Sequence, residues 1–215
     1  MGIYTEKGRS YSGSGVLIVE DYRKGEETIP CILVVRNQAS HNVSDFGGGY
    51  AKKHKKIEVT ASEELQEESR NLIRVPSAKI KLSRSFDIEG TRDTYYRVYV
   101  VKTQNVASKY FDINREVIDS NPDSTRQWKE TDKIHHIPIA NIKFAKLLDR
   151  QKIIVRDVHD EEVVLHMRLR KALHTGQNIV LEVLKEDPVL TKDNLLKIRE
   201  NDKSFLIGTY QFAKD

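Results

Sequence analysis

Runs of branched aliphatic residues alternate with polar stretches in the first part of the chain. Two such runs, residues 15–20 and 29–36, have the length and the Val, Ile and Leu content of β-strands. The polar segment 21–27 between them predicts a turn, so the two strands form a hairpin or lie side by side. The segment 1–14 is rich in glycine, serine and charge, which predicts a loose arm unless it adds an edge strand.

The apolar spacing changes after a run of three glycines. Ala61, Leu65 and Leu72 fall near the 3.6-residue period of an α-helix, and the positions between them are mostly charged. This pattern predicts a helix that ends near Arg70 or Asn71.

Farther along the chain, strand-like and helix-like segments alternate. We expect strands over 79–88 and 94–102 with a turn at 90–93, a polar loop over 112–127, a helix over 160–173 ended by Gly176, a strand or helix extension over 179–184, and a last short helix over 191–200. The simplest partition is an arm (1–14), an α/β domain (15–150) and a C-terminal extension (151–215) packed on the same domain.

Composition narrows the class of protein. With 215 residues, 38% of them hydrophobic and 32% charged, the chain is long enough for a packed core. Cys31 is the only cysteine, so no internal disulfide forms, and we expect a reducing compartment: the cytoplasm, with the nucleus as the alternative. No apolar run approaches the roughly 20 residues that span a bilayer, so no membrane segment is expected. The net charge of +4 permits an anionic partner without requiring one.

The helix predicted after the glycines carries the candidate chemistry. Glu64, Glu67 and Glu68 are spaced i, i+3 and i+4, which places three carboxylates on one helix face. Left unpaired, these charges would repel one another. Mg²⁺ or Mn²⁺ prefers carboxylate oxygens and is readily shared with substrate phosphates, so a divalent-cation site is one interpretation. The other is an exposed acidic face neutralised by lysines.

A Gly-Gly turn precedes these glutamates and makes the segment recognisable. Glycines let backbone groups approach a metal or a phosphate closely. Residues 49–71 resemble the box of the Nudix hydrolase superfamily, Gly-x5-Glu-x7-Arg-Glu-U-x-Glu-Glu-x-Gly-U, in which U is aliphatic. Five of the nine defined positions agree: Gly49, Glu64, Leu65, Glu67 and Glu68. Residues 46–49, Phe-Gly-Gly-Gly, also resemble the Phe-Pro-Gly-Gly approach of the family, with glycine in place of proline.

Four positions depart from the box. Lys55 stands where the family has Glu, and Glu63 stands where it has Arg. Because those two residues form an ion pair in the family, we expect the same pair here with its signs reversed. Arg70 replaces a glycine and Asn71 replaces an aliphatic residue. Since Asn tolerates the left-handed turn that ends the helix, we expect the helix to stop at Asn71.

The start of the helix is open between two interpretations. Thr-Ala-Ser-Glu at 60–63 fits a capping box, in which Glu63 has a capping role. The resemblance instead implies a start near Lys56.

The resemblance implies a fold and a metal site. The fold is a Nudix-like α/β/α sandwich with a mixed central sheet, here with a C-terminal helical elaboration. In the family, glutamates of the box hold Mg²⁺ or Mn²⁺ together with a backbone carbonyl. The implied ligands here are Glu64, Glu67, Glu68 and the carbonyl of Gly48 or Gly49.

A further glutamate commonly comes from a loop after the central strands of the family, as a metal ligand or a general base. Counting back from Ile-Pro-Ile at 137–139 points to Glu130, with Glu116 as the competitor. Each is otherwise an ordinary solvated loop carboxylate. The general base is therefore Glu67, Glu68 or Glu130, and the sequence leaves these alternatives open.

Lys52, Lys53 and Lys55 belong to a basic run beside the predicted metal site. This run attracts a polyphosphate or an RNA backbone without regard to sequence, or it is a solvated loop. Trp128 is the aromatic residue that we assign to stacking on a base, although such a residue often fills a core instead. The expected partners are a nucleotide or polyphosphate substrate and, as an alternative, RNA. The oligomeric state is open and includes a homodimer.

We therefore expect metal-dependent hydrolysis of the phosphoanhydride in a nucleoside diphosphate linked to another group. Removal of the mRNA cap is a more specific form of this activity that the basic run would suit. The rival interpretation is a Nudix-fold protein that binds an RNA cap or a nucleotide without cleaving it. Retention of the three clustered glutamates favours catalysis, whereas the changes at Lys55, Glu63 and Arg70 favour divergence.

Overall fold

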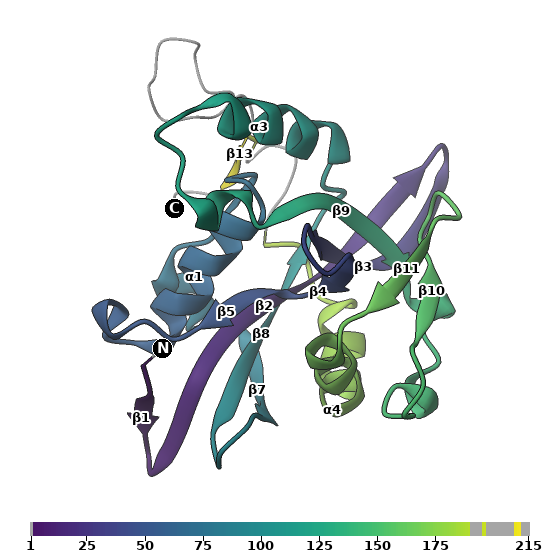
Figure 1. The fold of residues 1–215 in the computed structure, drawn as a ribbon. Helices are drawn as coiled ribbons and strands as arrows, with labels where there is room; N and C mark the ends of the chain where they lie inside the picture. Colours follow the sequence, from purple (N-terminus) through teal and green to yellow (C-terminus); the bar gives the residue numbers. More distant parts are fainter. Residues whose placement is uncertain (1, 190–194, 197–208, 212–215) are drawn as a thin grey trace.

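The computed structural model describes residues 2–189, 195–196 and 209–211 (Figure 1). Its centre is a mixed β-sheet in the order β10-β11-β4-β3-β2-β8-β7, with β1 and β5 paired to β2 and β9 paired to β3. The strands of this sheet are β1 (Tyr4–Glu6), β2 (Arg9–Lys24), β3 (Glu27–Asn37), β4 (Asn42–Ser44), β5 (Phe46–Gly49), β7 (Arg84–Glu89), β8 (Tyr95–Thr103), β9 (Thr131–Pro138), β10 (Ile154–Arg156) and β11 (Glu162–Leu165). A second, smaller sheet has the order β12-β13-β6, made of β6 (Ile73–Arg74), β12 (Leu195–Leu196) and β13 (Thr209–Gln211).

The long strand β2 organises the central sheet. Its second half pairs antiparallel with β3 around a two-residue turn at Gly25, which confirms the predicted hairpin. The polar residues 21–24 continue the ladder, so the turn is much shorter than the segment 21–27 expected for it. The first half of β2 pairs antiparallel with β5, and β8 runs parallel to β2. The strand predicted over 94–102 is β8.

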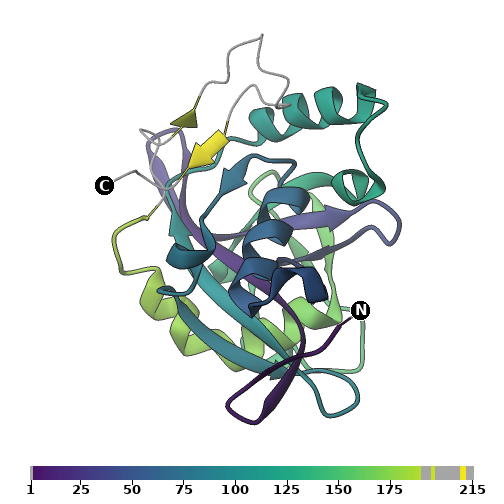
Figure 2. The same ribbon diagram turned by 90° about the vertical axis from the view of Figure 1, so that its left-hand side faces the viewer.

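Helices cover both faces of this sheet. They are α1 (Ile57–Glu68), α2 (Ser77–Ile80), α3 (Ser108–Ser120) and α4 (Met167–Val183), with 3₁₀ turns η1 (Lys52–His54), η2 (Arg126–Lys129), η3 (Ile139–Asn141) and η4 (Phe144–Lys146). Figure 2 shows α1 in front of the sheet and α4 behind it. The structure is therefore an α/β/α sandwich with a mixed sheet.

Alternation along β2 builds the two halves of the core. Successive side chains of a strand point to opposite faces. Val16 and Ile18 belong to the buried cluster that contains Leu65 of α1. Leu17 and Val19 belong to the cluster on the other face, with the apolar side of α4. An unbroken aliphatic run thus becomes a strand that is buried on both faces.

The segment 112–127, predicted as a polar loop, begins inside α3. Phe111 and Ile118 are two turns apart and both are buried, while most of the residues between them are polar. The polar composition therefore concealed an amphipathic helix.

The helix predicted over 160–173 is wrong at both boundaries. Residues 162–165 form β11, and α4 begins at Met167 and continues through Gly176 to Val183. A Cβ at position 176 would lie less than 3.0 Å from the ring of Phe86, so the glycine allows a close approach of helix and sheet instead of ending the helix. Of the two alternatives for 179–184, the helix extension is correct.

Two further predicted elements differ from the structure. The strand expected over 79–88 begins only at Arg84, because residues 77–80 form the helical turn α2. The helix expected over 191–200 lies mostly outside the described residues, and Leu195–Leu196 within it form β12.

Segments before residue 15 and after residue 150 both contribute to the central sheet. The segment 1–14 contains β1, which pairs with β2, as in the edge-strand alternative. Beyond residue 150, β10 and β11 extend the sheet, and Leu169 and Leu173 of α4 lie in the same core cluster as Leu17. The boundary drawn at residue 150 stays a prediction. None of the described helices combines the length and apolarity needed to cross a bilayer.

Candidate active site

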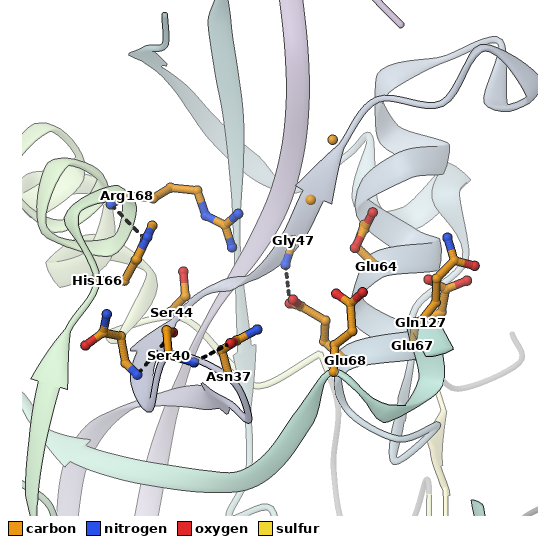
Figure 3. A pocket seen from close by; sticks show the side chains of 14 residues that line it. Asn37, Ser40, Ser44, Gly47, Glu64, Glu67, Glu68, Gln127, His166 and Arg168 are labelled. Carbon is orange, nitrogen blue, oxygen red and sulfur yellow. Dashed lines mark hydrogen bonds between the residues drawn. The ribbon is translucent and has the colours of Figure 1, made fainter. Parts of the chain in front are cut away.

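A cavity of about 390 Å³ lies where β5 meets α1 (Figure 3). Its described lining consists of Asn37, Ser40, Asn42, Ser44, Gly47, Gly48, Gly49, Glu64, Glu67, Glu68, Gln127, Glu130, His166 and Arg168. The glycines and the three clustered glutamates come from the recognised segment. The other residues come from the β3–β4 region, the segment before β9 and the start of α4.

The glycine run places backbone directly against the glutamates. Gly47, Gly48 and Gly49 pair with β2, which lies beneath α1, so the strand passes close to the helix. A Cβ on Gly48 would lie 2.5 Å from the carboxyl carbon of Glu64. Any other residue at position 48 would therefore displace that carboxylate or the strand.

The three glutamates of α1 share one wall of the cavity. The N–H of Gly47 donates to Oε2 of Glu68 at 2.6 Å, which holds that carboxylate against the strand. Burial raises the pKa of Glu64 to about 7, and the neighbouring charge of Glu67 adds to the effect. Burial also raises the pKa of Glu67 and raises that of Glu68 well above its usual range. The protein alone therefore does not stabilise three negative charges at this wall.

Glu130 adds a fourth carboxylate to the same cavity. It is exposed, lies between η2 and β9, and raises the pKa of both Glu64 and Glu67 through its charge. Glu116, the competing candidate, is on α3 and lines a different hollow with Val117 and Ser120. The structure thus brings Glu130, but not Glu116, to the clustered glutamates.

The wall opposite α1 carries residues that sequence reasoning did not find. Arg168 donates from Nε to Oδ1 of Asp45 at 2.8 Å and from Nη2 to the Asp45 carbonyl oxygen at 3.1 Å. Its guanidinium lies 4.9 Å from the centre of the Tyr96 ring. His166 caps α4 by accepting the Arg168 backbone N–H. Figure 3 shows His166 and Arg168 on the side of the cavity away from the glutamates. No local motif connects these residues to the recognised segment, about a hundred positions earlier.

The predicted substrate-binding residues are not among the described residues of the cavity wall. Lys52, Lys53 and Lys55 are exposed on and beside η1, before α1. Lys53 acts electrostatically on the cluster, because its charge lowers the pKa of Glu67. Trp128 is partly buried and lines a separate cavity of about 230 Å³ with Gln66 and other residues. Their roles in binding stay predictions.

The expected ion pair between Lys55 and Glu63 is wrong. Oε2 of Glu63 lies 3.5 Å from Lys53 Nζ and 2.8 Å from His54 Nε2. Lys55 has a left-handed backbone with φ of 60°, which closes the η1 turn, and its side chain is exposed. The turn therefore presents Lys53 and His54 to the helix in place of Lys55.

The ends of α1 settle both boundary alternatives. The helix begins at Ile57 with Lys56 as its N-cap, as the resemblance implied, so the capping box at 60–63 is wrong. It ends at Glu68, earlier than expected, and two hydrogen bonds close a Schellman motif: Asn71 N–H to Gln66 O, and Arg70 N–H to Glu67 O. Both Arg70 and Asn71 have positive φ, so the left-handed turn is present without glycine.

Arg70 replaces the family glycine with a structural function of its own. Its side chain is 1% exposed and donates from Nε and Nη2 to the Thr131 carbonyl oxygen. Nη1 donates to Asp119 at 2.8 Å. The Arg70 side chain thus links the end of α1 to α3 and to the start of β9, next to Glu130.

A second group of potential metal ligands lies elsewhere in the described part of the chain. Atoms of His135, Asp157 and Glu161 lie within 4.8 Å of one another. However, Asp157 already accepts from His135 Nδ1 and from two backbone N–H groups, and Glu161 pairs with Lys133 and Arg36. These oxygens already have protein partners, so this group fits a structural ion-pair network better than a metal site.

Comparisons with known proteins found similar solved structures. No protein-family model and no curated protein matches the sequence. The structure is similar to a MutT/nudix family protein from Enterococcus faecalis, with a TM-score of 0.48 and 12% identity over 86% of this chain and 68% of that one. It is also similar to the Nudix hydrolase RenU from M. smegmatis (TM-score 0.42, 10% identity, 84% and 94% covered) and to an Ap4A hydrolase from C. elegans (0.35, 12%, 59% and 78%). All three TM-scores are below 0.5, and all three identities are 12% or lower.

Proposed function

We propose that the protein is a metal-dependent hydrolase of Nudix type that cleaves the phosphoanhydride of a nucleoside diphosphate linked to another group. One observation carries the proposal: Glu64, Glu67, Glu68 and Glu130 converge on a single polar cavity, against a glycine strand in which a Cβ at Gly48 would meet the Glu64 carboxylate. A merely solvated acidic face would not be buried enough to raise the pKa values of three adjacent carboxyl groups.

The residues of this wall fit a divalent cation. Mg²⁺ and Mn²⁺ take oxygen ligands, and the α1 glutamates supply carboxylate oxygens while Gly48 or Gly49 supplies a carbonyl. The raised pKa values mean that the protein alone does not compensate these charges. A bound cation would compensate them and keep all three groups ionised at neutral pH.

The proposed reaction uses these positions. A divalent cation held by Glu64, Glu67 and Glu68 would neutralise phosphate oxygens and lower the pKa of the water that attacks phosphorus. We assign the general base to Glu130 and not to Glu67 or Glu68, because those two are proposed to hold the cation and Glu68 also accepts from the Gly47 N–H. Glu130 is exposed on a separate segment at the cavity. The other phosphate then leaves with the group attached to it.

Removal of the mRNA cap is the more specific form of this proposal. Its support is the exposed basic run of Lys52, Lys53 and Lys55 just before α1, which attracts RNA through its phosphates.

The competing function is binding of an RNA cap or a nucleotide without cleavage. Its support is the altered pairing at Glu63, next to the metal-binding glutamates.

The test is a substrate panel with Mg²⁺ or Mn²⁺: capped RNA, nucleotide sugars, dinucleoside polyphosphates and inositol pyrophosphates. Glu67→Gln is the test variant and Glu116→Gln is the matched control, because Glu116 lies outside the cavity. We expect metal-dependent turnover that Glu67→Gln abolishes and Glu116→Gln leaves intact. Binding without turnover across the panel, unchanged by a chelator, would instead identify a recognition protein.

A further inference from the structure

The wall opposite α1 holds a cation that the proposed reaction does not yet use. Arg168 lies in the first turn of α4 and lines the cavity, and its charge lowers the pKa of both Glu64 and Glu68 on the facing wall. The guanidinium is therefore close enough to act on the groups proposed to hold the metal.

The buried surroundings of Arg168 fix its orientation. Asp45 is fully buried and, besides Arg168, accepts from the hydroxyl groups of Ser44 (2.9 Å) and Tyr96 (3.0 Å). The ring of Tyr96 lies against the guanidinium. Because Asp45 is held by three partners, it fixes the Nε edge of Arg168 and leaves the rest of the planar group little freedom.

The donors that remain make Arg168 a binding group. A guanidinium has five N–H donors. Two are used on Asp45, and no acceptor among the described residues takes the other three. The side chain is 24% exposed, and this exposure is to the cavity that it lines. A guanidinium that served only to join α4 to Asp45 would not need to present donors to a cavity.

We propose that Arg168 binds phosphate oxygens of the substrate from the wall opposite the carboxylates, and that Asp45 positions it. The planar fork of Arg matches two oxygens of a phosphate, which Lys does not do. The identity of the ligand as a substrate phosphate rests on the proposed function. The anion site itself does not, because it is defined by Arg168, Asp45 and the cavity.

Methylenediphosphonate is the appropriate probe, because its P–C–P bridge resists hydrolysis. The described lining of the cavity contains no Phe, Tyr or Trp side chain that could stack on a base, so a probe without a base is sufficient. Calorimetric titration of the full chain in Mg²⁺ compares the wild type with Arg168→Gln, Arg168→Lys and Arg156→Gln. Arg156 is an exposed arginine on the edge strand β10 and serves as the control.

We expect Arg168→Gln to weaken diphosphonate binding by about tenfold or more, because hydrogen bonds to charged groups are lost. Arg168→Lys is expected to recover part of this loss, and Arg156→Gln to lose nothing. Arg168→Gln leaves the buried charge of Asp45 without its partner cation, and this variant is replaced, if it does not fold, by the double variant Arg168→Gln with Asp45→Asn. The double variant removes both charges of the pair. Wild-type affinity in a folded variant that lacks Arg168 would overturn the proposal.

Kinetics separate this proposal from the proposed function. With any substrate from the panel, we expect Arg168→Lys to raise KM more than it lowers kcat, whereas Glu67→Gln abolishes kcat. Absence of turnover in the wild type, with diphosphonate binding that depends on Arg168, would end the hydrolase proposal and keep the anion site. Turnover that depends on Glu67, with KM and diphosphonate affinity unchanged in the Arg168 variants, would keep the hydrolase proposal and end the anion-site proposal.

Discussion

The raised pKa of Glu64 makes a quantitative prediction about stability without metal. A carboxyl group that binds its proton more tightly in the folded than in the unfolded chain loses stability as pH rises between the two pKa values. For Glu64 the window runs from the ordinary 4.5 to about 7. At about 1.4 kcal/mol per pKa unit, the loss across this window is about 3 kcal/mol.

Glu64→Gln removes this titration while keeping the shape of the side chain. In the presence of a chelator, we expect the variant to equal the wild type near pH 5 and to exceed it near pH 8 by up to about 3 kcal/mol in the free energy of unfolding. Glu67 and Glu68 also have raised pKa values, so the free energy of unfolding of the variant still falls as pH rises, but by less than that of the wild type.

Urea denaturation at pH 5, 6, 7 and 8 measures the difference. Burial lowers the pKa of His54, His135 and His166, so these histidines add stability as pH rises, but they are common to both proteins and cancel in the comparison. Saturating Mg²⁺ at pH 8 should stabilise the wild type and stabilise Glu64→Gln less, because the cation binds the folded site. Parallel pH profiles for the two proteins would refute the assignment of a buried carboxylate with a raised pKa at position 64.

Two further substitutions test the geometry around α1. Gly48→Ala places a methyl group 2.5 Å from the Glu64 carboxyl carbon, and the carboxylate can swing aside to make room. We therefore expect Mn²⁺ affinity measured by calorimetry to fall at least about tenfold, while the urea midpoint changes little. Unchanged Mn²⁺ affinity would contradict this. Arg70→Gly relieves the left-handed backbone but removes buried hydrogen bonds to Thr131 and Asp119. We expect a net destabilisation of about 1–3 kcal/mol in urea unfolding. A gain in stability would show that the side chain contributes less than the backbone strain costs.

The sequence alone determined those features that depend on local geometry. Residues at i, i+3 and i+4 share a helix face in any α-helix, so the common wall of Glu64, Glu67 and Glu68 followed from their spacing. The aliphatic run of β2 and its hairpin with β3 followed from strand composition and a turn. Glu130 could be predicted because the recognisable Ile-Pro-Ile segment at 137–139 follows it by only a few residues.

Local pattern failed where side-chain partners decide the structure. The polar composition of α3 concealed Phe111 and Ile118, whose burial exists only against the sheet. Gly176 looked like the end of a helix because glycine often has that role, yet here it allows contact with Phe86. The partner of Glu63 depended on the left-handed backbone at Lys55, which turns a different pair of basic residues toward the helix.

The second wall of the cavity was decided only by the tertiary structure. Asp45 lies before β5, Tyr96 on β8 and Arg168 on α4, so more than a hundred residues of chain separate the two charges of the Asp45–Arg168 pair. The pairing depends on the crossing of α4 over the sheet, and no sequence period encodes such a crossing. A helix can place its own carboxylates on one face, whereas only the packed fold can place an arginine opposite them.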